Sequence, residues 1–123
     1  MLAGKVVRIR WVKQYPTAHN HLAIGHVVRE TDNYLAVLCK TYHFGGNLGG
    51  GGSKSCKLKR GAFIGGVLES EKAVRIIPWT QIEVMHELPE RTKWDVEAVV
   101  DDSGLCYLDN EQKTLISRPV NGL

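Results

Sequence analysis

The sequence predicts an all-β protein built around a small β-barrel, and two segments carry that prediction. Residues 25–38 have the pattern of a strand, a polar turn at positions 31–33 and a second strand. Residues 77–85 have the pattern of a strand ended by proline, a tight turn and another strand. A chain of 123 residues with 43% hydrophobic content is long enough to bury its own core, so we expect a globular protein.

The first expected strand spans residues 5–13. Its apolar residues alternate, so that Val7, Ile9 and Trp11 lie on one side and two arginines share the other. This pattern is typical of a strand that is buried on one face.

The next segments alternate between loops and strands. Residues 14–21 contain proline and mixed polar residues and predict a loop. The runs 22–29 and 35–44 are rich in β-branched and aromatic residues, which favour strands. Residues 45–55 are mostly glycine and predict either a flexible loop or an engineered linker, because they supply almost no side chains for a core.

Three further runs complete the expected barrel. Residues 62–69 and 73–77 are strand-like and flank a short polar segment. Residues 81–88 fit either a strand or a short helix. The barrel is therefore expected to occupy residues 1–88, with the glycine-rich loop inside it.

Residues 89–123 differ in character and are expected to form a C-terminal β-meander. The apolar runs 96–100, 105–108 and 114–117 are separated by acidic and polar turns. Such an extension completes the barrel, covers an open edge or pairs with a neighbouring subunit. The sequence does not choose among these arrangements.

The cysteine pattern and the absence of a long apolar segment indicate the cellular compartment. Cys39, Cys56 and Cys106 are an odd number at wide spacing, which does not predict a disulfide framework. Cys39 and Cys106 lie in apolar runs and are expected to be small core residues. No apolar run approaches the roughly 20 residues of a membrane-spanning helix, and the N-terminal residues lack the pattern of a secretion signal. We therefore expect a cytoplasmic protein with no membrane partner.

Basic residues are clustered, although the net charge of +3 alone does not indicate a nucleic-acid partner. Such clusters form either a phosphate-facing patch or an ordinary solvated face. One cluster lies in the first expected strand and the other follows the glycine-rich segment: Arg8, Arg10 and Lys13, then Lys54, Lys57, Lys59 and Arg60.

The pattern of residues 25–38 and 77–84 resembles the two motifs of the Sm and Sm-like (LSm) proteins. In that family a glycine, alternating apolar residues, an acidic turn and an apolar run are followed later by a strand, Arg-Gly and another strand. The similarity covers about residues 4–88 without the glycine-rich loop. It implies a strongly bent, SH3-like or Sm-like barrel that forms a homo-oligomeric ring through its edge strands.

The chain departs from the family at the positions that contact nucleotides. The turn aspartate of the family falls on Thr31, its base-reading asparagine on Leu35, and its Arg-Gly pair on Pro78 and Trp79. The usual uridine site is therefore not preserved, because leucine and proline cannot replace those hydrogen bonds.

Neighbouring residues offer a substitute site for single-stranded RNA. Tyr34 and Trp79 provide rings on which bases stack, whereas the alternative role for both is core or interface packing. Asn33 either contacts RNA or serves a turn with positive φ. The full set of RNA-binding candidates is Thr31, Asp32, Asn33, Tyr34, Trp79, Arg8, Arg10, Lys57, Lys59 and Arg60.

No pattern predicts an enzyme, a cofactor or a metal site. The glycine-rich segment lacks the Gly-Lys-Ser/Thr order of a phosphate loop, and no nucleophile signature is present. Glu69, Glu71, Glu83 and Glu87 lie in polar stretches where no buried partner is apparent.

The histidines come closest to a metal-binding pattern. His19 and His21 share one side of an extended segment, with His26, His43 and Cys39 as further ligands if the sheet brings them near. Local spacing supplies no third ligand, so no metal is expected.

Two functions therefore remain: a ring-forming module that binds single-stranded RNA, and a non-catalytic scaffold or protein-interaction barrel. Basic residues that bind RNA should matter for salt-dependent affinity, whereas ordinary surface charges should not. The RNA-binding module is the preferred hypothesis.

Overall fold

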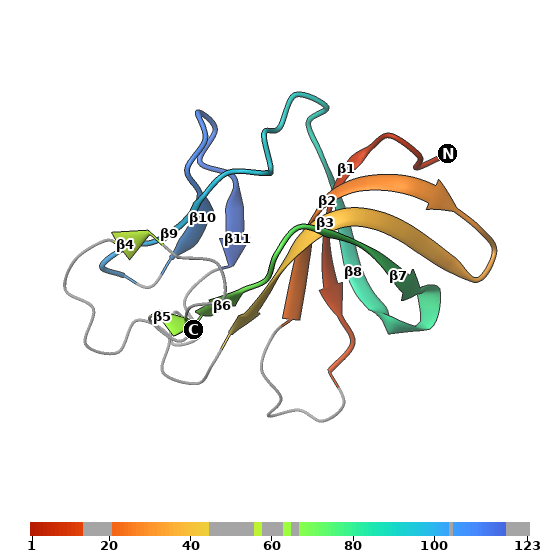
Figure 1. Cartoon of the computed structure of the whole chain (residues 1–123), viewed down its shortest axis with the longest axis horizontal. Helices are drawn as coiled ribbons and strands as arrows, with labels where there is room; N and C mark the ends of the chain where they lie inside the picture. The colour runs from red at the N-terminus through yellow and green to blue at the C-terminus, as the bar shows by residue number, and fades with distance from the viewer. Residues whose placement is uncertain (14–20, 45–55, 58–62, 65–66, 104, 118–123) are drawn as a thin grey trace.

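The computed structural model describes residues 1–13, 21–44, 56–57, 63–64, 67–103 and 105–117. These residues form strands in two antiparallel sheets and one short 3₁₀ turn (Figure 1). The elements are β1 (Val6–Trp11), β2 (His21–Glu30), β3 (Tyr34–Phe44), β4 (Cys56–Lys57), β5 (Phe63–Ile64), β6 (Val67–Glu69), β7 (Ala73–Pro78), η1 (Trp79–Gln81), β8 (Ile82–Leu88), β9 (Ala98–Val100), β10 (Cys106–Leu108) and β11 (Leu115–Ser117).

The first sheet is organised around the long β2–β3 hairpin. Its strands follow the order β5-β6-β3-β2-β1-β8, and β7 also pairs with β3. The free side of β3 is shared, because its first part pairs with β7 and its last residues pair with β6. Ser70 bridges the two partners, since its hydroxyl accepts a 2.8 Å hydrogen bond from the Thr41 amide and its own amide donates to the Thr41 carbonyl at 2.9 Å.

The first sheet curls around a core of its own, which we call the inner core. Its fully buried residues come from β1, β2, β3 and β7, and Trp11, Trp79, Ile82 and Met85 pack against them. Gly25 permits this tight packing, because a Cβ at that position would lie 2.0 Å from the Leu38 carbonyl oxygen and 2.6 Å from Cys39 Cα. Only glycine fits such a close approach of two strands.

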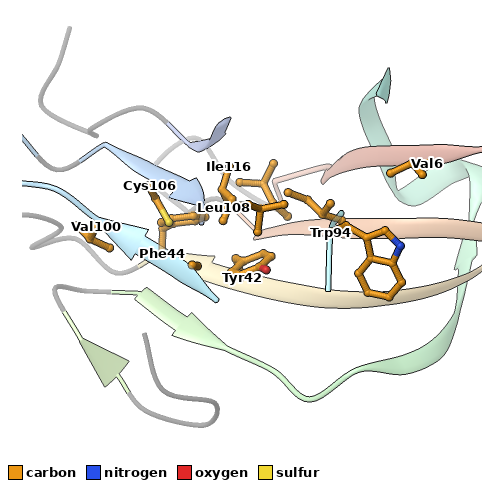
Figure 2. Packing of buried hydrophobic residues seen from close by; sticks show 11 residues of the cluster. Val6, Tyr42, Phe44, Trp94, Val100, Cys106, Leu108 and Ile116 are labelled. Atoms are coloured by element: carbon orange, nitrogen blue, oxygen red, sulfur yellow. The ribbon is translucent and has the colours of Figure 1, made fainter. Parts of the chain in front are cut away.

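The second sheet, in the order β11-β10-β9-β4, covers the opposite face of the first. Between them lies the inter-sheet core, to which Val6, Leu22, Ile24, Tyr42 and Phe44 contribute from the first sheet, and Trp94, Ala98, Val100, Cys106, Leu108 and Ile116 from the C-terminal segment. Figure 2 shows Tyr42 and Phe44 extending from β3 toward Cys106, Leu108 and Ile116. Complete burial of such side chains contributes about 1.5–3 kcal/mol each, so this core attaches the C-terminal strands firmly.

The structure confirms the all-β prediction but not a closed barrel. Within the described residues β7 pairs only with β3 and β8 only with β1, and η1 joins these two strands without pairing them. The run 81–88 is a strand rather than a helix. The run 62–69 is not one strand, because β5 and β6 pair with each other as antiparallel neighbours.

The predicted division at residue 88 stays a prediction, although two features bear on it. The C-terminal strands pack on the first sheet of the same chain, and β4 from the N-terminal part joins their sheet. The loop 14–20 and the glycine-rich segment 45–55 lie outside the described residues. In the part of the chain that is described, no helix has the length and apolar character needed to cross a membrane.

Candidate functional site

The turn between β2 and β3 is built by the side chain of Thr31. Its Oγ1 accepts hydrogen bonds from the amides of Asn33 at 3.2 Å and Tyr34 at 3.0 Å, and its amide donates to the Tyr34 carbonyl at 2.9 Å. This arrangement is a local side-chain-to-backbone turn of the kind that threonine favours. Asp32 and Asn33 are exposed at its tip.

The alternative role of Asn33, in a turn with positive φ, is wrong. Among the described non-glycine residues only Lys113 has a positive φ, of 50°. The Thr31 hydroxyl stabilises the turn in its place, so Asn33 does not need the left-handed conformation. The presence of asparagine at position 33 is therefore not explained by a need for positive φ.

Trp79 attaches η1 to this turn. Its indole Nε1 donates a 2.8 Å hydrogen bond to the Thr31 carbonyl, and its amide donates to the Asn33 carbonyl at 3.2 Å. The ring also packs against the inner core. The structure thus brings together Thr31, Asp32, Asn33, Tyr34 and Trp79, although 48 positions separate Thr31 from Trp79. We call these five residues the turn cluster.

Sequence reasoning missed Arg29 as a member of this region. Its guanidinium carbon lies 5.4 Å from the centre of the Tyr34 ring, in a cation–π contact, and the side chain is exposed. The pairing of β2 with β3 shifts between Val27 and Arg29, which opposes Ala36. Nothing in the residue pattern indicated this bulge, so the contact could not be predicted.

The predicted basic residues lie away from the turn cluster or outside the residues that the structure describes. Arg8 donates to the Leu115 carbonyl at 2.9 Å and lies 3.1 Å from His86 Nδ1, while Arg10 forms a 2.6 Å ion pair with Glu83. These contacts join β1 to β8 and β11 rather than to the turn cluster. Of Lys57 only the backbone in β4 is described, and Lys59 and Arg60 lie outside the described residues.

A second group of side chains gathers at the other end of the hairpin. His21 stacks on Trp11 with ring centres 4.3 Å apart and planes inclined by 14°, and His43 lies 5.4 Å from His21. Burial is the main reason why the pKa of His21 is below its usual value, and the nearby charges of His43 and Arg75 add to the effect. His21 is therefore kept in its neutral form more strongly than a solvated histidine.

Arg75 is held beside this group by polar contacts to four residues, one of which is a 3.4 Å hydrogen bond to the Ala73 carbonyl. Its guanidinium donates to the Cys39 carbonyl at 2.8 Å, and to Ser70 Oγ and the Glu71 carbonyl at 3.1 Å each. Burial raises the pKa of the Cys39 thiol, and Arg75 partly opposes that shift. Cys39 is fully buried in the inner core and Cys106 in the inter-sheet core, as expected for small core residues.

Glu69 has a buried partner that the sequence did not reveal. Glu69 is 2% exposed, and its Oε1 lies 3.7 Å from Nζ of Lys40, which is 1% exposed. The Lys40 ammonium also donates a 2.6 Å hydrogen bond to the Val96 carbonyl. A lysine within a strand gives no sign of burial in the sequence, because its environment depends on which segment packs over it.

No family model, curated protein or solved structure matches this chain. Function is therefore argued from the geometry of the described residues. Within them no three His, Cys, Asp or Glu side chains are grouped as a metal centre. The turn cluster offers exposed hydrogen-bonding groups on Asp32 and Asn33 and half-buried aromatic rings on Tyr34 and Trp79, which suits binding rather than covalent chemistry.

Proposed function

We propose that this chain is a non-catalytic, Sm-like module that forms homo-oligomers and binds single-stranded RNA at the turn cluster. The observation that carries the proposal is the connection of η1 to the β2–β3 turn through the two hydrogen bonds of Trp79. This connection unites two segments distant in sequence into one surface, where the polar residues of the turn are exposed and the two aromatic residues are half-buried.

The sheet order supports a strongly bent barrel of the SH3-like or Sm-like type. Strands β7, β3, β2, β1 and β8 are consecutive neighbours, and the three residues of η1 connect the two outer strands. A common core inside these strands is what a bent sheet that approaches closure requires.

The chemistry of the turn cluster fits unpaired bases. The exposed side chain of Asn33 carries both a donor and an acceptor for a base edge. Tyr34 lies beside the exposed Arg29, so an aromatic face and a guanidinium plane are available together for stacking and for phosphate contact. The indole N–H of Trp79 is already used, so only its ring would contribute.

Exposed edges support assembly. Val74 is 56% exposed and Ile76 is 54% exposed, and both lie on β7, whose only partner within the described residues is β3. An edge strand with exposed apolar residues is a template for pairing with another chain. The edges of β7 and β8 in neighbouring copies would form a closed ring if the rotation between copies closes.

The test is binding of fluorescent single-stranded RNA to nucleic-acid-free protein at several salt concentrations, with the native mass recorded in each sample. We expect a multimer whose affinity falls steeply with salt. Tyr34→Ala should weaken binding about fivefold to a hundredfold, which corresponds to about 1–3 kcal/mol for one stacked base. Tyr107→Ala is the matched control, because Tyr107 is a half-buried tyrosine in the second sheet.

Two results would contradict the RNA proposal. One is an equal loss of affinity in both tyrosine variants, and the other is no binding by a well-formed oligomer. A monomeric protein would contradict the assembly proposal separately.

A scaffold or protein-interaction module is the second candidate. It is favoured by the engagement of Arg8 and Arg10 in contacts within the chain, which makes them less available to phosphates. This alternative would be supported if the protein forms an oligomer that does not bind RNA and if Ile76→Lys dissociates that oligomer.

A further inference from the structure

His21 and His43 face each other across the β2–β3 hairpin. They are direct partners in the antiparallel register, near the start of β2 and the end of β3. Directly opposed residues have Cβ atoms about 4.5–5.5 Å apart, which is close enough for two imidazoles to converge on one point. Both side chains lie at the end of the hairpin that is remote from the turn cluster.

The separation of the two rings matches chelation of one ion. Their centres are 5.4 Å apart and their planes are inclined by 34°. A zinc–nitrogen bond of about 2.0–2.1 Å, extended by about 1.2 Å to the ring centre, gives centres about 5.2 Å apart at a tetrahedral angle. The two imidazoles are therefore spaced as two ligands of a tetrahedral metal ion.

The surroundings hold His21 in a fixed orientation. Trp11 stacks on its ring almost in parallel, at 4.3 Å and 14°. This stacking restricts rotation of the His21 ring. His43 is exposed, so solvent can reach the point between the rings and supply further ligands.

One nearby charge opposes a cation. Arg75 lies close enough to interact with His21, but its guanidinium is directed to Cys39, Ser70 and Glu71 by hydrogen bonds. The residual positive charge disfavours hard ions held by charge alone, such as Mg²⁺. It is less adverse to borderline ions that form directional bonds with imidazole nitrogen.

We propose that His21 and His43 form a two-histidine site for a divalent late transition-metal ion, with Zn²⁺ as the representative ion and water in the remaining positions. The site is independent of the turn cluster and of the proposed RNA binding. Its metal would clamp the open end of the β2–β3 hairpin by linking two adjacent strands.

Calorimetric titration of the full chain without an affinity tag, with Zn²⁺ and with Mg²⁺, tests the proposal. We expect one Zn²⁺ per chain and no comparable binding of Mg²⁺. His43→Ala should lower the Zn²⁺ affinity by more than the roughly tenfold to hundredfold that loss of an outer-shell partner causes. His86→Ala is the matched control, since His86 is also an exposed histidine on a strand and lies beside Arg8.

A second measurement locates the ion directly. Nitrogen-15 spectra of the histidine side chains should change at His21 and His43 when Zn²⁺ is added, and not at His86. The proposal is overturned if wild-type protein binds no Zn²⁺, if Mg²⁺ binds equally well, or if His43→Ala retains the wild-type affinity. Because His43 is exposed, its replacement does not threaten the fold, and folding is checked by circular dichroism.

Discussion

The buried ion pair between Lys40 and Glu69 predicts a large and specific stability effect. Both side chains are almost completely buried, and their charged atoms are 3.7 Å apart. At an effective dielectric constant of about 20, two unit charges at this distance attract by about 4 kcal/mol. Removal of one charge deprives the other buried charge of this partner, and breaking a buried ion pair in this way typically destabilises a protein by about 3–5 kcal/mol.

We therefore expect Glu69→Gln to lower the free energy of unfolding by about 3 kcal/mol or more, which is a large part of the total for a small domain. Lys40→Met should have a similar effect, since it also removes the 2.6 Å hydrogen bond to the Val96 carbonyl. The double variant should be much less destabilised than the sum of the two, because it leaves no isolated buried charge.

Urea unfolding of the wild type, both single variants and the double variant measures this coupling, provided that the m-value stays constant. Lys72→Ala is the matched control, because its 2.8 Å ion pair with Asp95 is substantially exposed. That change should alter stability by less than about 1 kcal/mol. Additive single effects, or single effects as small as the control, would refute the reasoning.

Three other changes test the hairpin. Gly25→Ala should destabilise the fold by about 3 kcal/mol or more in urea unfolding, because the new Cβ meets the Leu38 backbone oxygen at 2.0 Å; a loss below about 1 kcal/mol would contradict this close approach. Thr31→Val should cost about 1 kcal/mol and Thr31→Ser much less, because only the hydroxyl accepts the Asn33 and Tyr34 amides; equal losses would exclude that role. Burial raises the pKa of Cys39, so native protein should resist iodoacetamide at pH 8, as followed by peptide mass spectrometry. Rapid labelling of the native protein would contradict the burial of Cys39. The stability contributed by the protonated Cys39 thiol is present below the pKa of the unfolded state and is lost as pH rises through the pKa of the folded state.

Local alternation made most strands predictable. Val7 and Ile9 enter the inner core with Trp11 packed against it, as the period of two required. The polar turn 31–33 also lies between two strands, as predicted. Both features depend on neighbours in sequence, which is why the sequence alone was sufficient.

Long-range pairing was not predictable in the same way. The sharing of the β3 edge by β6 and β7 depends on tertiary register, as does the bulge that lets Arg29 oppose Ala36. The candidate site shows the same limit. The grouping of Thr31 with Trp79 was anticipated only through the family resemblance, and the facing of His21 and His43 follows from a register that composition cannot set.

The packing of the two cores restricts where this protein can bind anything. One face of the first sheet encloses the inner core, and the C-terminal sheet covers much of the other, so the broad surfaces of the β2–β3 hairpin are mostly used for stability. Exposed side chains remain at the tip of the turn cluster, at His43 and on β7. Because these regions involve different residues, separate substitutions test the proposed RNA binding, the proposed metal binding and the proposed assembly. If the chain assembles through β7 as proposed, Ile76→Lys should dissociate the assembly and leave the proposed affinity of each chain for Zn²⁺ unchanged.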